Sequence, residues 1–164
     1  MKDFSQNGEG KIIADYFGER KGVFLDIGAN DGTVLSNTRG LHMKGWNGVL
    51  VEPSAAAFQK LVSLYEPMEG AKLIQAAITL TDAPVDFYDS GTHLKKGDVA
   101  LLSTTRPEEM DRWKKSGEQF TKTQVRGITF ETLMKETGVT HFDMISIDAE
   151  GMDWEILKQI DLTA

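Results

Sequence analysis

The sequence predicts an α/β fold built on a doubly wound, mostly parallel β-sheet. Short apolar runs alternate with helix-like segments in the order strand, helix, strand, helix, strand over residues 22–78. The apolar runs show no polar–apolar alternation, which indicates parallel strands covered on both faces. The length of 164 residues fits a single domain, residues 1–164, around one core.

Hydrophobic periodicity and turn residues define the individual elements. The predicted elements are a helix at 9–20, a strand at 22–28, a weaker helix at 33–45, strands at 47–53 and 71–78 around a helix at 54–66, an antiparallel strand pair at 85–90 and 123–129, helices at 106–115 and 130–138, a strand at 141–151 and a helix at 152–160. Ser54 is expected to cap the helix that follows it. Ile12, Ile13, Tyr16 and Phe17 share one face of the first helix, and the Tyr16–Phe17 pair is expected to pack in the core.

Composition excludes several classes of protein. Eighteen basic residues against 25 acidic ones give a net charge of −7, which disfavours a partner such as nucleic acid or an anionic membrane. Without cysteine, the chain has no disulfide, zinc–thiolate site or thiol nucleophile. The polar first residues do not resemble a signal peptide, and no apolar run is long enough to span a membrane. We therefore expect a cytoplasmic protein.

Three of the predicted strands run into a carboxylate: Asp26, Glu52 and Asp148. In open parallel sheets ligands bind beyond the carboxyl ends of the strands, so these side chains are expected to meet in one crevice. The turn from Gly28 to Gly32 precedes a helix, and Glu52 follows it at the distance typical of a residue that binds ribose hydroxyls. Together these features predict a nucleoside-containing cofactor.

A structural interpretation of the same residues remains open. Gly28 and Gly32 could simply shape a turn between strand and helix, and Glu52 could be an exposed strand end. Carboxylates at the start of a helix are favoured by its dipole, so capping explains Glu150 and Asp153 as well as function does. Asp148 differs because it ends a predicted buried strand.

The glycine turn favours a cationic cofactor over a dinucleotide. Asn30 occupies the second glycine position of the G-x-G-x-x-G pattern, which argues against an NAD-dependent oxidoreductase. Asp26 and Asp31 add negative charge where a pyrophosphate would lie. S-Adenosylmethionine carries a sulfonium and an ammonium, and Asp26 would either attract this charge or fix the loop.

Several blocks of sequence resemble a known family. "FLDIGANDGTVLSNT", "GVLVEPS", "QAAI" and "FDMISIDAEGMDWEIL" occur in the order found in the FkbM family of S-adenosylmethionine-dependent methyltransferases, and "FSQNGEGKIIADYF" resembles the segment that precedes its first strand. The resemblance extends from about Phe4 to Leu162. It implies a class I methyltransferase-like fold and O-methylation of a sugar, a glycan or a small natural product.

The residues and the resemblance together predict the site. The expected cofactor-binding residues are Asp26, Gly28, Ala29, Asn30, Gly32, Asn37, Glu52, Ser54, Ala77 and Asp148. By the resemblance, the turn from Gly28 would line the methionine, Glu52 would bind the ribose, and Ala77 would lie beside the adenine. The candidate catalytic residues, as bases for an acceptor hydroxyl, are Asp148, Glu150 and His93. No metal site is expected.

The polar segment 91–122 is expected to cover the crevice. His93 lies in this segment, as do Arg106, Trp113 and Lys114. The last three could contact an acceptor, but a solvent-facing helix is the simpler interpretation of their pattern.

The sequence departs from the family at its end. The usual seven-stranded sheet has three more strands after the fourth, so we expect a domain that lacks its last strands. The uncovered fourth strand would then be an apolar edge, which predicts self-association into a homo-oligomer. The same departure leaves a second hypothesis open, a non-catalytic or incomplete domain that binds S-adenosylmethionine.

Overall fold

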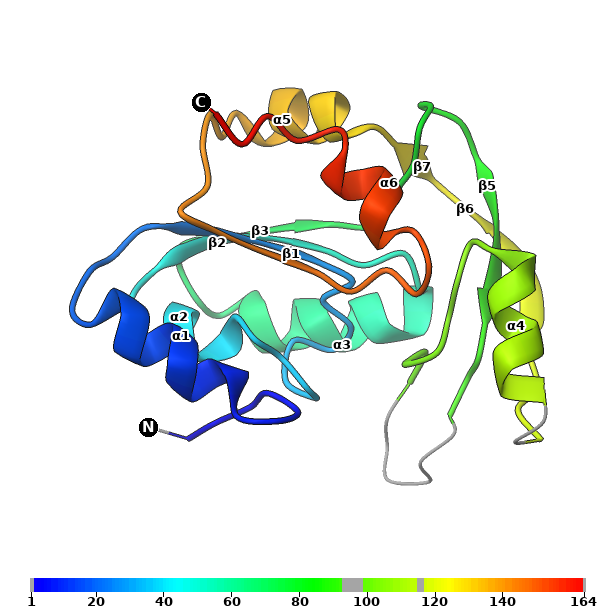
Figure 1. Cartoon of the computed structure of the whole chain (residues 1–164), viewed down its shortest axis with the longest axis horizontal. Helices are drawn as coiled ribbons and strands as arrows, with labels where there is room; N and C mark the ends of the chain where they lie inside the picture. The colour runs from blue at the N-terminus through cyan, green and yellow to red at the C-terminus, as the bar shows by residue number, and fades with distance from the viewer. Residues whose placement is uncertain (1, 93–98, 115–116, 164) are drawn as a thin grey trace.

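A four-stranded parallel sheet forms the centre of the computed structural model, which describes residues 2–92, 99–114 and 117–163 (Figure 1). The strand order is β3-β2-β1-β8, and every pair of neighbours is parallel. The strands are β1 (Val23–Ile27), β2 (Asn47–Val51), β3 (Ala71–Ile74) and β8 (Met144–Ile147). The predicted α/β class with a mostly parallel sheet is therefore confirmed.

Helices cover both faces of this sheet (Figure 1). One face carries α1 (Glu9–Phe17), α2 (Arg39–Met43) and α3 (Ala55–Tyr65), and the other carries α5 (Phe130–Thr137) and α6 (Asp153–Leu157). Alternate residues of β1 enter different cores: Phe24 packs with Leu61 of α3, whereas Leu25 packs with Leu133 of α5 and Ile156 of α6. Burial on both faces explains why the strands read as continuous apolar runs.

A smaller unit lies beside the end of the sheet (Figure 1). It consists of β5 (Val85–Asp89), which pairs with the antiparallel β6 (Thr121–Val125), of α4 (Pro107–Lys114), and of the described residues 99–106 that lead into α4. The short helix beginning at Pro107 and the antiparallel pairing agree with the sequence prediction. The second strand was predicted at 123–129, but only its part up to Val125 pairs with β5, whereas Gly127 and Ile128 pair with another strand.

The predicted strand at 71–78 is divided between two sheets. Only β3 joins the central sheet, whereas β4 (Ala77–Ile78) pairs in parallel with β7 (Gly127–Ile128). The backbone N–H of Ala77 donates to the carbonyl of Arg126, and Ala76 between the two strands is fully buried. The chain therefore changes its partner within a run that periodicity reads as continuous.

Half of the predicted helix at 33–45 is a loop. The Asp31 carboxylate accepts hydrogen bonds from the backbone N–H groups of Thr33 and Val34, each at 2.8 Å. Leu35 has φ 57°, and α2 begins only at Arg39. Local side-chain bonds thus satisfy backbone groups that a helix would otherwise use.

One expectation about a helix face and one about a helix end were wrong. Ile12 and Tyr16 are each 71% exposed, while Ile13 and Phe17 pack against the core, so the Tyr16–Phe17 pair does not enter the core as a whole. The apolar stripe of α1 is wider than the surface that it covers. In the last helix Ile156 is fully buried, but α6 ends at Leu157 rather than continuing to residue 160.

Strand β8 lies at one edge of the sheet. Within the described ranges its hydrogen-bonded neighbour is β1 alone. Self-association through this edge stays a prediction. No helix in the described part of the chain is long and apolar enough to cross a membrane.

Candidate active site

The turn after β1 is pressed against the end of β8. Gly28 has φ 83°, and a β-carbon at this position would overlap the backbone carbonyl oxygen of Asp148. The N–H groups of Gly28 and Ala29 both donate to the carbonyl of Val51 at the end of β2. Glycine is therefore required for the close approach of three strand ends.

Glu52 connects the second strand end to the glycine turn. One carboxylate oxygen accepts the backbone N–H of Asn30 at 2.9 Å, and the other accepts that of Ser54 at 2.7 Å. The side chain is only 5% exposed. Burial raises the pKa of its carboxyl to about 7, although the two N–H groups favour the ionised form.

Asp26, on β1, is buried below the turn. Its carboxylate accepts the hydroxyl of Thr38 at 2.5 Å, which fixes the loop that leads into α2. Burial raises the pKa of the Asp26 carboxyl to about 6, and the nearby Asp148 adds to this effect. Of the two roles predicted for Asp26, fixing the loop is directly visible.

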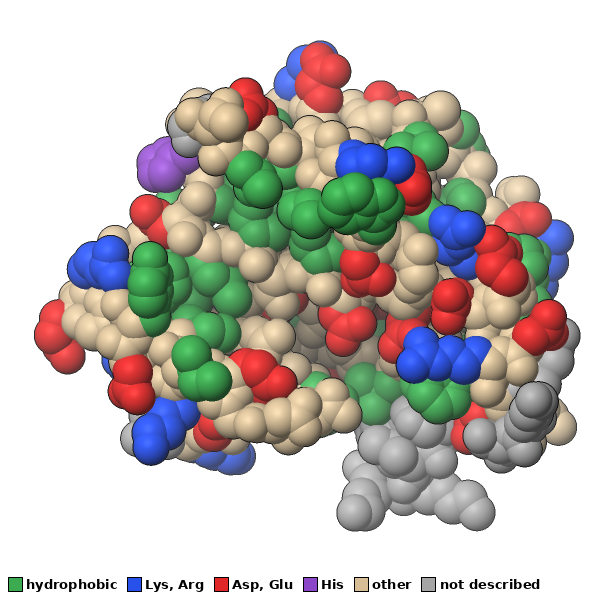
Figure 2. Space-filling model, in the orientation of Figure 1, with side chains coloured by type: hydrophobic (Ala, Val, Ile, Leu, Met, Phe, Trp, Pro, Cys, Tyr) green, Lys and Arg blue, Asp and Glu red, His purple; other side chains and the backbone are tan. Residues whose placement is uncertain are grey.

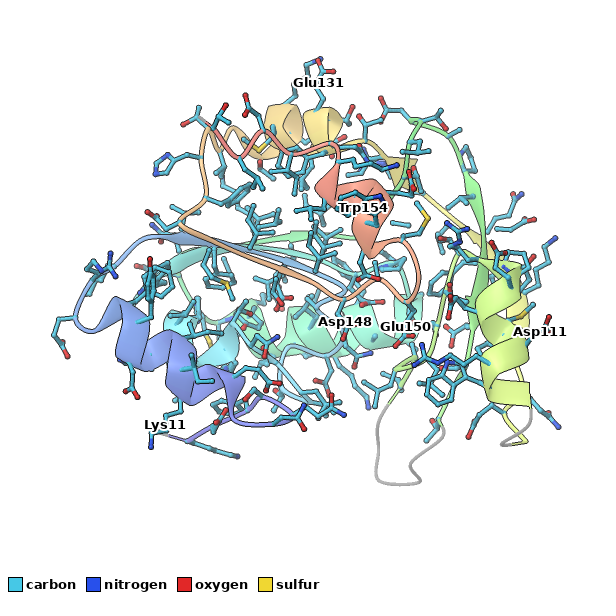
Figure 3. The ribbon with its side chains drawn as sticks, in the orientation of Figure 1. Lys11, Asp111, Glu131, Asp148, Glu150 and Trp154 are labelled. Atoms are coloured by element: carbon cyan, nitrogen blue, oxygen red, sulfur yellow. The ribbon has the colours of Figure 1, made fainter. Side chains whose placement is uncertain are left out.

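The segment after β8 presents two carboxylates. Asp153, which begins α6, accepts the backbone N–H groups of Ala149 at 2.9 Å and Gly151 at 3.3 Å, and Glu150 between them has φ 42°. Figure 3 shows Asp148 and Glu150 side by side on this turn, between the sheet and α4. Partial burial raises the pKa of Asp148 and raises that of Glu150 to about 7, and like charges add to both shifts.

These residues line one cavity of about 360 Å³. Figure 2 shows acidic side chains gathered near the centre of this face of the molecule. Of the predicted site residues, the cavity is lined by Asp26, Gly28, Ala29, Asn30, Asn37, Glu52, Ala77, Asp148 and Glu150. The three carboxylates at separate strand ends therefore converge.

Two of the predicted residues that the structure describes, Gly32 and Ser54, do not contribute to this lining. Gly32 faces Leu61 and Tyr65 of α3, and the Ser54 hydroxyl caps α3 and donates to Asp89 at 3.0 Å. His93 lies outside the described residues. Within the described ranges no group of three or more His, Asp or Glu residues is arranged to hold a metal ion.

The smaller unit supplies one wall of the cavity, in line with the cover expected from the segment 91–122. Residues 100–105 and Trp113 line the cavity, so Trp113 is not the solvent-facing residue that its helix suggested. The polarity of the segment 91–122 indicated a cover, but which of its residues meet the strand ends depends on the tertiary structure.

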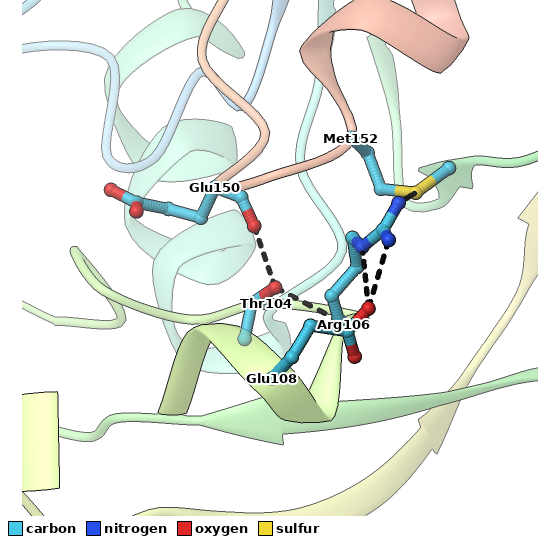
Figure 4. A network of polar contacts seen from close by, with 5 residues as sticks. All are labelled: Thr104, Arg106, Glu108, Glu150 and Met152. Atoms are coloured by element: carbon cyan, nitrogen blue, oxygen red, sulfur yellow. Dashed lines mark hydrogen bonds and ion pairs between the residues drawn. The ribbon is translucent and has the colours of Figure 1, made fainter. Parts of the chain in front are cut away.

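Hydrogen bonds fasten this unit to each of the three strand ends. The Asn30 side chain donates to the carbonyl of Val99 at 2.6 Å, and Ser54 contacts Asp89. The Thr104 hydroxyl donates to the carbonyl of Glu150 at 2.7 Å, beside the ion pair of Arg106 with Glu108 (Figure 4). The covering wall is thus aligned with the residues that it encloses.

Comparison with known proteins gives the family. The methyltransferase FkbM domain matches residues 26–164. This range begins within β1, at Asp26, and contains every site residue named above. A comparison with curated proteins finds no significant match. The match covers most of the chain, and the chain belongs to the FkbM methyltransferase family.

Proposed function

We propose that this protein transfers a methyl group from S-adenosylmethionine to a hydroxyl oxygen of a sugar, a glycan or a small natural product. The observation that carries the proposal is the convergence of Asp26, Glu52 and Asp148 around the Gly28 turn in one cavity. Membership of a methyltransferase family supplies the reaction class.

The residues present fit such a cofactor. Glu52 retains free lone pairs on both carboxylate oxygens beyond its two backbone partners, so it has the capacity to accept ribose hydroxyls. Ala77 and Ile78 provide an apolar wall for the adenine, and the turn from Gly28 to Asn30 would hold the methionine. The negative lining suits a sulfonium ligand with net positive charge.

Bound S-adenosylmethionine would supply a methyl group already activated by the positive sulfur. The protein then has to align the acceptor and remove its proton. Glu150 fits the second task, because a carboxyl with a pKa of about 7 is half ionised near neutral pH. Asp148, beside it at the end of β8, would orient the same hydroxyl or share its proton.

Calorimetric titration with S-adenosylhomocysteine and, separately, with NAD tests the cofactor. We expect binding of the first and none of the second, because Asn30 and the acidic lining oppose a pyrophosphate. Binding of NAD alone would refute the proposal. Transfer of the labelled methyl of S-adenosylmethionine to a panel of glycosides tests catalysis, and cofactor binding without any transfer would favour the non-catalytic hypothesis.

A further inference from the structure

The cavity extends beyond the residues expected to hold the cofactor. Its far wall includes Leu101, Leu102, Thr105 and Trp113 of the smaller unit, together with Met152, which follows β8. The side chains of this wall are mainly apolar, whereas the residues at the ends of the strands contribute carboxylates. An acceptor that binds here must therefore combine an apolar surface with hydrogen-bonding groups.

Charge restricts the acceptor further. The described lining residues include four carboxylates, Asp26, Glu52, Asp148 and Glu150, and no lysine, arginine or histidine. Arg112 acts on Glu150 from outside the lining, but none of the described lining residues carries a positive charge that would meet a negatively charged acceptor. Like charges a few ångströms apart inside a partly dehydrated cavity repel strongly, so the lining selects against carboxylate and phosphate groups.

Within the part of the chain that the structure describes, the indole N–H of Trp113 has no hydrogen-bond acceptor. The indole nitrogen itself is buried. The guanidinium of Arg112 lies 5.2 Å from the ring centroid, which supports the ring from one side. An indole offers a broad apolar surface and one N–H donor, a combination that matches a ring with both C–H groups and oxygen atoms.

We propose that Trp113 is a specificity-determining residue that holds an uncharged, hydroxyl-bearing ring in the far part of the cavity, and that the surrounding carboxylates exclude anionic acceptors. The C–H face of the ring packs on the indole, one of its oxygen atoms accepts the indole N–H, and a hydroxyl faces Glu150. This inference rests on the proposed function, because it assigns the part of the cavity next to the cofactor.

The test follows the indole N–H resonances of the three tryptophans, Trp46, Trp113 and Trp154, in ¹⁵N-labelled protein saturated with S-adenosylhomocysteine. The neutral probes are the methyl glycosides of glucose, galactose and mannose, together with myo-inositol. Each glycoside is paired with its uronate, which differs only by a carboxylate at C6. Trp113→Phe and Trp154→Phe assign the resonances.

We expect the Trp113 resonance to move with at least one neutral probe, and the matching uronate to bind roughly tenfold more weakly or worse. Trp113→Ala should weaken that neutral probe by about tenfold and leave S-adenosylhomocysteine affinity within about twofold. Trp113→Phe keeps an aromatic ring and loses the N–H, so its affinity for the neutral probe should lie between those of the wild type and Trp113→Ala. Trp154→Ala is the control, because Trp154 lies 65% exposed on the outer side of α6 (Figure 3).

Two results would overturn the inference. One is a uronate that binds as tightly as its neutral partner, and the other is a Trp113 resonance that no neutral probe moves. Because the titrations use the unchanged protein, they decide the question even if Trp113→Ala does not fold. If S-adenosylhomocysteine binds but no neutral probe shifts the Trp113 resonance, only this inference fails. Absence of S-adenosylhomocysteine binding refutes the proposed function itself.

Discussion

The carboxylate of Glu52 accepts the backbone N–H of Asn30 at 2.9 Å, so the end of β2 holds the conformation of the turn after β1. Glu52→Gln would set an amide NH₂ group against a backbone N–H. A buried donor left without an acceptor costs about 1–3 kcal/mol. We expect S-adenosylhomocysteine affinity to fall by roughly tenfold or more in calorimetric titration. The exposed Glu66→Gln is the control, and unchanged affinity in Glu52→Gln would rule out the proposed role.

Replacement of Gly28 should disrupt the convergence of the strand ends. The added β-carbon of Gly28→Ala would overlap the carbonyl of Asp148 and also require a positive φ. Gly138→Ala is a matched control with φ 66° and open space around its β-carbon. We expect the control to lose about 1 kcal/mol of unfolding free energy in urea. Gly28→Ala should lose at least about twice as much, and equal losses would show that the contact is unimportant.

Stability should depend on pH through the buried carboxyls. The pKa values of Asp26 and Glu52 are raised to about 6 and about 7, so the folded state keeps protons that the unfolded state releases near pH 4. Between these values the folded state binds more protons, and the unfolding free energy therefore falls as pH rises from about 5 to about 7. Buried His42, with a lowered pKa, opposes this trend because its protonation below pH 6.5 favours the unfolded state.

The contribution of Glu52 is isolated by comparing the wild type with Glu52→Gln. The difference in melting temperature should shift in favour of the variant between pH 5.5 and pH 8, because only the wild type has to bury a charge at Glu52 above about pH 7. A difference that stays constant over this range would contradict a raised pKa at Glu52.

Glu150→Gln should separate catalysis from binding. An amide cannot accept the proton of the acceptor hydroxyl, so we expect turnover to fall by roughly 100-fold or more while S-adenosylhomocysteine affinity changes little. In the wild type the rate should decrease as pH falls below the Glu150 pKa of about 7. Asp148→Asn is the parallel variant. Equal losses of turnover and cofactor affinity in either variant would assign that residue to cofactor binding instead.

Thr104→Val should loosen the covering unit. It removes the 2.7 Å hydrogen bond to the carbonyl of Glu150 and the acceptor of the Arg106 backbone N–H, while keeping a side chain of similar shape. We expect a loss of about 1 kcal/mol in unfolding free energy and a larger Michaelis constant for the acceptor. The exposed Thr140→Val serves as the control. If the acceptor Michaelis constant stays the same, Thr104 only stabilises the fold.

Most of the fold could be predicted because local signals agreed with tertiary packing. The N-cap at Ser54 follows from short-range chemistry and appears as expected, and the alternating strand around Phe87 pairs with an antiparallel neighbour as predicted. One error occurred where a distant strand decided the outcome, and another where a local side chain competed with the helix. Ala77 leaves the central sheet to pair with Gly127, and Asp31 unwinds the start of a helix by binding Thr33 and Val34.

The candidate site divides in the same way. The carboxylates Asp26, Glu52 and Asp148 were identified from the sequence, since the ends of parallel strands meet at one edge of a sheet. Trp113 was named only as a residue that could contact an acceptor, and a solvent-facing position was preferred, because nothing in a short polar helix reveals which of its faces meets a cavity wall. The sequence by itself determined which residues carry the chemistry: the acids that end the apolar strands, beside a glycine turn. Only the tertiary structure decided what encloses those acids, because contacts between residues distant along the chain depend on packing that no local pattern encodes.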